Sequence, residues 1–275
     1  MVDHGPGARV LAGGTDVVPW LRDEAIAPTA LIDIKSIPDL HLITDLDGSL
    51  HLGALVTFSD LLASPHVVAR YPILVEMGHL VASAGIRNRA TLVGNICSAV
   101  PSCDAGPVLL AYGAAVHVVG PEGRRDVSIA DWFEGPRATA LQADEIVAGL
   151  TVHAPSEPHG AAFAKLARYE GEDLAQANLA VVMAETHRYR VAFGAVGPTP
   201  RRANSIEQLL DGHPLEEDKI VAAQQLVADE ISPITDLRAT KEYREHMCRV
   251  MLGRGLRAAA SRLAGAGPPY PARLV

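Results

Sequence analysis

The chain of 275 residues is predicted to be an α+β protein. Short strand patterns are separated by Asp-Gly and Gly-Pro turns, and helical periodicity appears in separate blocks. The regular strand–helix–strand alternation of a doubly wound parallel sheet is absent. Hydrophobic residues make up 48% of the chain and charged residues 20%, which is typical of a packed globular protein.

The first half is predicted to contain short strands, two hairpins and several helices. Strands are expected at residues 9–12, 30–33 and 145–152, and hairpins at 40–53 and 116–128. Helices are expected at 15–22, after the capping residue Thr57, at 71–82 and at 104–110, with Gly113 ending the last. Helical periodicity fails between residues 85 and 102, so this stretch is expected to bind a ligand or to be poorly ordered.

A change of composition at Ala154–Pro158 predicts two domains, at residues 1–155 and 156–275. In the second domain, residues 160–166 and 177–185 are apolar enough for either buried strands or helices. A strand is expected at 189–196, followed by helices at 205–210, 215–227 and 239–263.

The composition excludes several classes of protein. The net charge of −8 and an aromatic content of 4% argue against a nucleic-acid partner. Three cysteines are too few for a disulfide framework and fit a reducing compartment. The N-terminus lacks the pattern of a secretory signal, and no apolar run is long enough to span a membrane. We therefore expect a cytoplasmic protein.

Two hydrophobic runs are interrupted in a way that suits an anionic ligand. The first run, Val10–Leu21, is broken by Gly13-Gly14-Thr15-Asp16, and the second break reads Thr91-Leu92-Val93-Gly94-Asn95. Glycine allows positive φ and close approach of the main chain, so both breaks are suited to present amide groups to a dinucleotide. The Rossmann fingerprint G-x-G-x-x-G is absent. Read alone, the first break is also compatible with a plain β-turn.

Several motifs, in order, resemble one known family. These are VLAGGTD, IRNRATLVGN, PSCDAGPVLLAYGA, FAKLARYEGEDLA, VAFGAVGPTPRRA and ISPITDLRATKEYREHM. Together they are similar to the FAD-binding subunit of molybdenum hydroxylases, which include xanthine dehydrogenase and aerobic carbon monoxide dehydrogenase. The resemblance runs from residue 9 to residue 257. It implies a two-lobed FAD-binding domain of the PCMH/vanillyl-alcohol-oxidase type, followed by a C-terminal α+β lobe with a short antiparallel sheet and helices.

The resemblance also implies the residues of an FAD site. They are Leu11, Ala12, Gly13, Gly14, Thr15, Asp16, Val17, Thr91, Gly94, Asn95, Ser98, Asp104, Val147 and Lys165. No catalytic side chain and no metal ligand is implied, because the flavin carries the redox step.

Some of these residues have ordinary structural alternatives. Asp104 suits a helix N-cap as well as a cofactor contact. Lys165 is either a solvated lysine or a positive charge near the flavin, where it would stabilise the reduced ring. Val147 suits core packing as well as the adenine side, and Asp173 either faces the flavin or orients its loop. Val93 stands where the family has a glycine, which puts close backbone approach there in doubt.

The resemblance implies partners that this chain does not contain. Molybdopterin is expected on a large subunit and [2Fe-2S] clusters on a small subunit, in a heterotrimer or its dimer. Three cysteines cannot hold a four-cysteine cluster. Electrons would pass from the clusters to FAD and then to an external acceptor. Two alternatives stay open: a stand-alone FAD-dependent oxidoreductase, and a non-catalytic subunit that has lost FAD, suggested by Val93 and by an N-terminal element that looks truncated.

Overall fold

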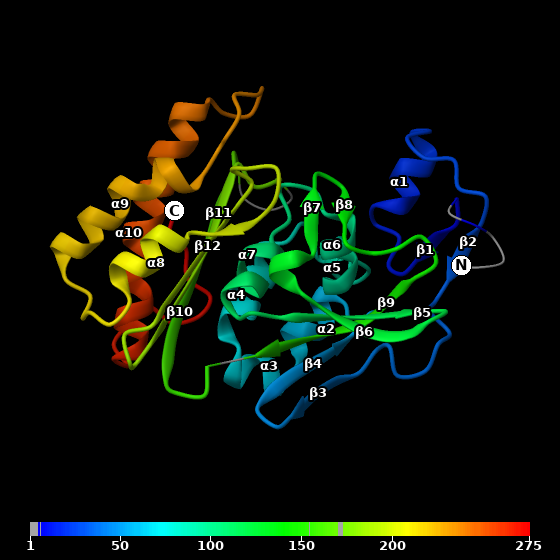
Figure 1. The fold of residues 1–275 in the computed structure, drawn as a ribbon, viewed down its shortest axis with the longest axis horizontal. Coiled ribbons are helices and arrows are strands. Elements are labelled where there is room, and N and C mark those ends of the chain that lie inside the picture. The colour runs from blue at the N-terminus through cyan, green and yellow to red at the C-terminus, as the bar shows by residue number, and fades with distance from the viewer. Residues whose placement is uncertain (1–4, 6, 154, 170–172) are drawn as a thin grey trace.

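The computed structural model describes residues 5, 7–153, 155–169 and 173–275. Ala154 of the predicted domain boundary, and Glu170, Gly171 and Glu172 of the FAKLARYEGEDLA motif, lie outside the described residues. The fold is α+β, as predicted, and consists of two larger sheets with their helices and a small N-terminal piece (Figure 1). No helix within the described ranges is long and apolar enough to cross a membrane.

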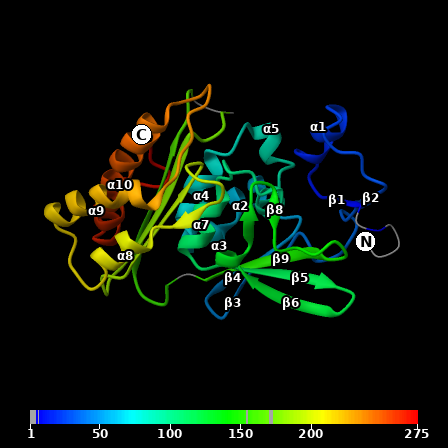
Figure 2. The ribbon, with the colours of Figure 1, turned by 45° about the horizontal axis from the view of Figure 1, so that its top comes forward.

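The N-terminal piece is a two-stranded parallel sheet with one short helix. β1 (Arg9–Leu11) pairs with β2 (Leu31–Asp33), and α1 (Val17–Arg22) connects them. The strand and helix predicted here are confirmed, each one or two residues shorter than expected. No residue of α1 is buried. Figures 1 and 2 both show this piece at the end of the molecule opposite the C-terminal helices.

A five-stranded antiparallel sheet forms the body of the first half. Its order is β3 (Ile43–Leu46), β4 (Ser49–Gly53), β9 (Ile146–His153), β5 (Ala115–Gly120) and β6 (Gly123–Ser128). Both predicted hairpins are confirmed. In the first, Asp47 and Gly48 have φ of 50° and 79°. Two positive φ values are what a tight turn needs to match the twist of its strands.

Helices cover one face of this sheet. They are α2 (Phe58–Ala63), α3 (Pro65–Arg70), α4 (Pro72–His79), α5 (Ala84–Arg87), α6 (Leu92–Ser98) and α7 (Ala105–Ala111). A short 3-10 turn at Ile129–Asp131 leads to the hairpin of β7 (Phe133–Gly135) and β8 (Ala138–Thr139). Thr57 caps α2, as expected. Of the two expectations for residues 85–102, poor order is wrong, because α5 and α6 lie there. Both helices are too short to show periodicity in the sequence.

The second sheet is buried on both faces. Its antiparallel order is β10 (His159–Leu166), β11 (Ala177–Ala184), β12 (Tyr189–Gly194) and β13 (Arg201–Arg202). Ala161 and Phe163 belong to the first core, whereas Ala162 and Ala164 belong to the second. Every residue of β11 is buried. A strand with two buried faces loses the polar–apolar alternation, which is why its sequence fits a helix equally well.

Three C-terminal helices pack on the outer face of this sheet. They are α8 (Asn204–Leu210), α9 (Glu217–Glu230) and α10 (Lys241–Leu263), and all three were predicted. The longest, α10, lies along β10 and β11. The second sheet is therefore a partition: α4 and α7 of the first half lie on one side, and α8–α10 lie on the other (Figures 1 and 2).

A buried ion pair passes through this partition. Glu76 on α4 is fully buried and accepts hydrogen bonds from both terminal nitrogens of Arg262 on α10, at 2.7 and 3.0 Å. The same carboxylate accepts from the amides of Phe163 and Ala272. Arg262 also donates to the carbonyl of Ala161 at 2.7 Å. The carboxylate is thus satisfied by three segments that are far apart in the sequence.

Replacing Arg262 by methionine tests the weight of this contact. Arg262→Met leaves Glu76 buried without its cation, so we expect the free energy of unfolding to fall by about 3–5 kcal/mol. Arg257→Met on the same helix is the matched control, because its pair with Glu217 is exposed and should contribute about 1 kcal/mol or less. Denaturant unfolding measures both. Equal losses of unfolding free energy in the two variants would contradict the conclusion that the pair of Glu76 and Arg262 is the more important for stability.

Candidate functional site

The residues predicted from the sequence surround one cleft of about 820 Å³. Its walls come from the β1–α1 segment, from α5 and α6, and from the segment between β8 and β9. All the predicted residues except Leu11 line this cleft. Leu11 instead lies in β1, where its carbonyl accepts a hydrogen bond from Ile34. The volume lies in the range of pockets that hold small molecules and cofactors.

The first loop presents free amide groups to the cleft. Within the described residues, the amides of Gly13, Gly14, Thr15 and Asp16 donate to no protein acceptor. Gly14 has φ of +79°, a conformation that strongly favours glycine. Successive unbonded amides in a turn form an anion-binding concavity. The loop therefore has the chemistry to hold a phosphate group.

Gly13 serves a different purpose from the one its sequence suggests. A Cβ atom at this position would lie 1.7 Å from the carbonyl oxygen of Arg89. The glycine is therefore required for close packing of the first loop against the segment that precedes α6. The two interrupted runs seen in the sequence are in direct contact.

The second interrupted run is the start of a helix rather than a loop. Thr91 is the N-cap of α6, and its hydroxyl accepts from the amide of Gly94 at 2.8 Å. A Cβ on Gly94 would lie 2.8 Å from that hydroxyl, so the glycine makes room for the cap. Val93 is buried within the helix and needs no positive φ. The concern that a valine at this position could not adopt positive φ therefore does not apply.

The polar side chains of α6 hold the neighbouring segments in place. The hydroxyl of Ser98 donates to the carboxylate of Asp16 and joins the helix to the first loop. The side-chain oxygen of Asn95 accepts from the amide of Ala105 at 3.2 Å and from the thiol of Cys103 at 3.0 Å. These side chains line the cleft, but their hydrogen bonds hold neighbouring protein segments in place.

Asp104 and Lys165 form a buried ion pair at the cleft. Their side chains are 10% and 5% exposed, with 2.7 Å between carboxylate and ammonium. Lys165 also donates to the carbonyl of Leu80, and Asn178 donates to Asp104 at 2.9 Å. The alternative of a solvated lysine is therefore wrong. Asp104 stands at the N-cap position of α7 but makes no capping bond with its side chain.

The charges of this pair balance each other. Burial raises the pKa of Asp104, and the nearby ammonium of Lys165 opposes that rise. Because the carboxylate lies against the ammonium, Lys165 does not present an isolated positive charge to the cleft. Its role is tied to that of Asp104.

The other titratable groups of the cleft are also engaged. Glu145 receives two hydrogen bonds from Arg125, which lower the pKa of its carboxyl. Asp173 is bonded to Arg168, and this bond lowers its pKa too. Burial raises the pKa of the Cys103 thiol to about 12, so it stays protonated at neutral pH.

Sequence reasoning missed several lining residues because no motif marks them. Examples are Trp20 on α1, Ala82 before α5, and Arg137, Thr139 and Glu145 in the segment around β8. Arg137 has φ of 59°, which is uncommon for a residue other than glycine, and nothing in the sequence indicates this conformation.

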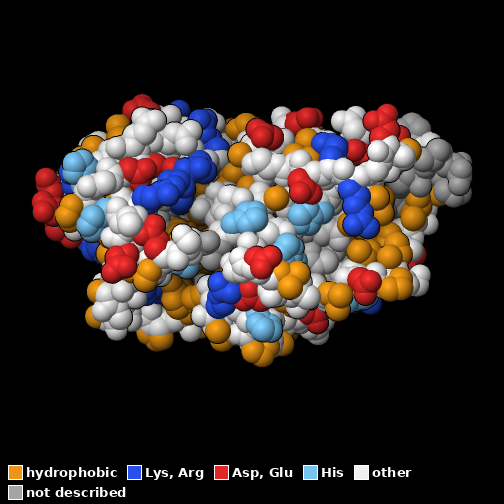
Figure 3. Space-filling model, turned by 60° about the horizontal axis from the view of Figure 1, so that its bottom comes forward, with side chains coloured by type: hydrophobic (Ala, Val, Ile, Leu, Met, Phe, Trp, Pro, Cys, Tyr) orange, Lys and Arg blue, Asp and Glu red, His pale blue; other side chains and the backbone are white. Residues whose placement is uncertain are grey.

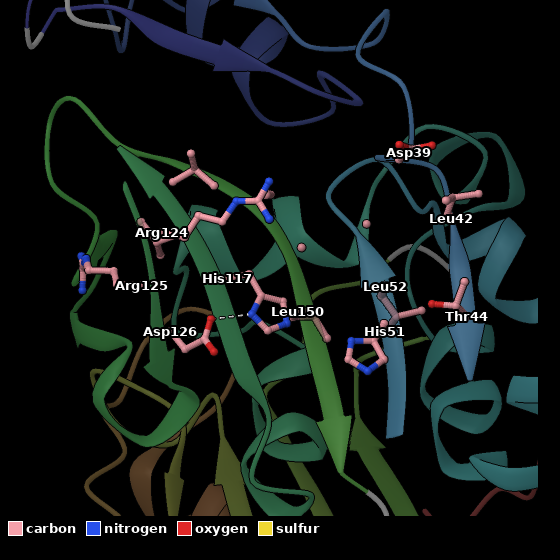
Figure 4. Close-up of a pocket in the computed structure, with 15 residues that line it drawn as sticks. Asp39, Leu42, Thr44, His51, Leu52, His117, Arg124, Arg125, Asp126 and Leu150 are labelled. Carbon is pink, nitrogen blue, oxygen red and sulfur yellow. Dashed lines mark hydrogen bonds and ion pairs between the residues drawn. The ribbon is translucent and has the colours of Figure 1, made fainter. Parts of the chain in front are cut away.

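A second, shallower groove of about 590 Å³ lies on the outer face of the five-stranded sheet (Figure 4). His117 is hydrogen-bonded to Asp126 at 2.7 Å and to Thr151 at 2.6 Å, and Thr151 is hydrogen-bonded to His51 at 2.9 Å. Figure 3 shows histidines gathered among basic and acidic side chains on this face. The described residues contain no group of histidine, cysteine and carboxylate side chains arranged to hold a metal ion.

The fold and the cleft define a two-part dinucleotide-binding protein without a Rossmann sheet, and comparison with known proteins gives the family. Residues 1–155 match the model of the FAD binding domain in molybdopterin dehydrogenase. Residues 161–259 match the model of the CO dehydrogenase flavoprotein C-terminal domain. The chain therefore belongs to the FAD-binding medium subunits of the molybdenum hydroxylase family, as the motifs predicted, and FAD is its cofactor.

Individual relatives agree along nearly the whole chain. The carbon monoxide dehydrogenase medium chain of Hydrogenophaga pseudoflava is 34% identical over 94% of this chain and 92% of its own. The putative xanthine dehydrogenase FAD-binding subunit of Escherichia coli is 33% identical over 90% and 86%. A solved structure of the Hydrogenophaga enzyme matches with a TM-score of 0.91, 34% identity and coverage of 95% and 92%. Quinoline 2-oxidoreductase from Pseudomonas putida 86 matches at 0.87, with 27% identity and coverage of 94% and 91%.

Adding one methyl group at Gly13 tests the contact between the first loop and the segment that precedes α6. In Gly13→Ala the new Cβ must displace the carbonyl of Arg89, which should lower the free energy of unfolding by about 1–3 kcal/mol and reduce FAD occupancy. Gly85→Ala is the control, because a Cβ there meets nothing within 4 Å. Thermal unfolding and the flavin content of the purified protein measure the effects. Equal unfolding and equal flavin content in the two variants would show that neither stability nor FAD binding depends on the contact between Gly13 and Arg89.

The buried pair predicts a change in the pH dependence of stability. In Lys165→Met the opposing ammonium is lost, so the folded-state pKa of Asp104 should rise further above its ordinary value of 3.8. The folded state then binds the proton more tightly than the unfolded state, and the free energy of unfolding falls as the pH rises above that value.

Denaturant unfolding at a series of pH values checks this sign. Lys165→Met should lose about 3–5 kcal/mol at neutral pH, because it strands a buried carboxylate. The double variant Asp104→Asn, Lys165→Met should show no such decline with pH. A single variant whose pH profile runs parallel to that of the native protein would refute the assignment.

Proposed function

We propose that this chain is the electron-transfer flavoprotein of a molybdopterin-dependent hydroxylase or dehydrogenase complex. When bound, FAD supplies the redox chemistry that takes electrons from [2Fe-2S] clusters and passes them to an external acceptor. The protein itself binds the cofactor, orients it and limits access of water to it. The observation that carries the proposal is the row of unbonded amides at Gly13–Asp16 beside a cleft of cofactor size.

The proposed FAD site consists of the predicted residues that surround this cleft. They are Ala12, Gly13, Gly14, Thr15, Asp16, Val17, Thr91, Gly94, Asn95, Ser98, Asp104, Val147 and Lys165, with Leu11 behind the first loop. Free amides suit the diphosphate, which is the most negative part of FAD. Val147 supplies an apolar wall for a ring. The pair of Asp104 and Lys165 would hold the far wall at a fixed distance from the first loop.

The state of the titratable groups favours this function over that of a stand-alone oxidoreductase. An enzyme that acts on its own substrate needs an acid or base within reach of the flavin. In the described part of the cleft, the carboxylates of Asp16, Asp104, Glu145 and Asp173 are all bonded to protein partners. A subunit that only relays electrons does not need a free one. The third alternative, a subunit without FAD, loses one of its two motivations, because Val93 lies inside α6 and needs no positive φ.

The proposal extends to the organisation and surroundings of the chain. Residues 1–155 would form the FAD-binding domain and residues 156–275 the C-terminal domain. The second hydrophobic core lies within the C-terminal domain, whereas the first also includes Ala161, Phe163 and other residues from one face of the second sheet. The partners would be a large molybdopterin subunit and a small [2Fe-2S] subunit, in a heterotrimer or its dimer. We place the complex in the cytoplasm, where free thiols such as Cys97, Cys103 and Cys248 stay reduced.

Substitution of Gly14 tests the first loop. In Gly14→Val a β-branched residue must adopt φ of +79°, so we expect the row of amides to shift and the purified chain to lose bound FAD. Gly113→Val is the matched control, because this glycine also has a positive φ, of 60°, but lies outside the cleft. The visible flavin spectrum and the denatured flavin content measure the result. Full FAD occupancy in Gly14→Val would remove this loop from the site.

The same preparation tests the partners. Tagged chain, expressed together with its genomic neighbours, should purify with an iron–sulfur subunit and a molybdopterin subunit. Reduction of its flavin by the complete complex, but not by the isolated chain, would support the relay function. A flavin that the isolated chain reduces at the expense of a small substrate would instead favour the stand-alone enzyme.

A further inference from the structure

The small N-terminal piece forms one wall of the cleft and is attached to the rest of the molecule by few apolar residues: Ile34 lies in the first core, and Val10, Ala12 and Ile32 pack against that core. α1 contains no buried residue, and β1 pairs only with β2 among the described strands. Its contacts with the body of the protein include the close approach of Gly13 to Arg89 and the bond from Ser98 to Asp16. Segments held by few buried contacts open most easily, so this wall is suited to move relative to the others.

A third contact between the N-terminal piece and the body of the protein joins Trp20 on α1 to Arg137. The guanidinium carbon of Arg137 is 5.1 Å from the centre of the Trp20 ring. Both residues line the cleft, although they are more than a hundred positions apart in the sequence. A guanidinium over the face of an indole is an attractive contact, and tryptophan is the most favourable partner for it.

The backbone of Arg137 is held firmly in place. Its φ of 59° places it in the left-handed region, and its amide donates to the carbonyl of Ala99 at the end of α6, at 2.8 Å. An arginine rarely adopts this conformation unless its surroundings enforce it. The side chain of Arg137 therefore extends from a fixed point on one wall of the cleft to Trp20 on the wall formed by the N-terminal piece.

We propose that Arg137 and Trp20 form a latch across the cleft that slows the release of FAD. The inference rests on the proposed function, because it takes the cleft as the FAD site. While the two side chains are in contact, the N-terminal piece is held against the body of the protein. Release of the cofactor requires the two walls to separate, so the contact must break first. The latch should affect the rate of FAD release more than the rate of binding.

A double-mutant cycle on the full chain tests the latch. The variants are Trp20→Leu, Arg137→Met and the double variant, and release of FAD after dilution is followed by the rise of free-flavin fluorescence. Each single variant should release FAD about two- to fivefold faster, which corresponds to one exposed cation–π contact. The double variant should be no faster than the faster single variant, because both remove the same contact.

Arg188→Met, an exposed arginine in the turn between β11 and β12, is the control and should leave the release rate unchanged. Additive effects would overturn the latch, since they would mean that Arg137 binds FAD by itself. Unchanged release in both single variants would overturn it as well. A native chain that holds no FAD would instead overturn the proposed function, so the two failures are distinguishable. Circular dichroism and thermal unfolding verify that every variant is folded.

Discussion

The architecture depends on charges that the two halves of the chain bury together. Asp104 belongs to the first half and Lys165 to the second, and each is the other's ion-pair partner. Glu76 of the first half and Arg262 of the second form another buried ion pair between the halves. A buried charge without its partner is strongly destabilising. The two halves must therefore fold into contact, and the first hydrophobic core already includes residues of the second half such as Phe163.

This junction also sets the position of the cleft. Asn178, on the central strand of the second sheet, donates to Asp104 and to the carbonyl of Cys103. The thiol of Cys103 donates to Asn95 on α6, and Ser98 on the same helix donates to Asp16. A chain of hydrogen bonds thus runs from the core of the C-terminal half to the first loop. The buried bonds of Asn178 hold α7 in place, whereas the first loop is joined to α6 by the part-buried bond from Ser98 to Asp16.

Much of the fold could be predicted because its signals are local. The turn at Asp47-Gly48, the cap at Thr57 and the periodicity of α10 each depend on a few neighbouring residues. The exceptions have physical causes. β11 is buried on both faces and so lacks alternation, and α6 is too short to show a period. The pairing of β10 with β11, and the choice of strand over helix there, are decided by tertiary packing that one sequence does not reveal.

The site was predictable as a set of residues but not as a set of roles. Nearly all the residues that the family motifs pointed to line the cleft, but many other lining residues carry no motif. They did not indicate that Lys165 is neutralised by Asp104, or that Gly13 is there to admit a carbonyl group. Trp20 and Arg137 were missed because their contact joins two segments without motifs. Roles of this kind depend on distances across the fold, which the order of residues does not contain.

The packing of Gly13 against Arg89 has a consequence for how this protein can change over evolutionary time. The glycine-rich loop and the segment before α6 share one interface in which a single added methyl group does not fit. Neither segment can drift independently: a larger residue in the loop would need a compensating displacement of the backbone at Arg89. The two motifs that look separate in the sequence are therefore inherited as one unit, and their covariation should extend to residues that never touch the cofactor.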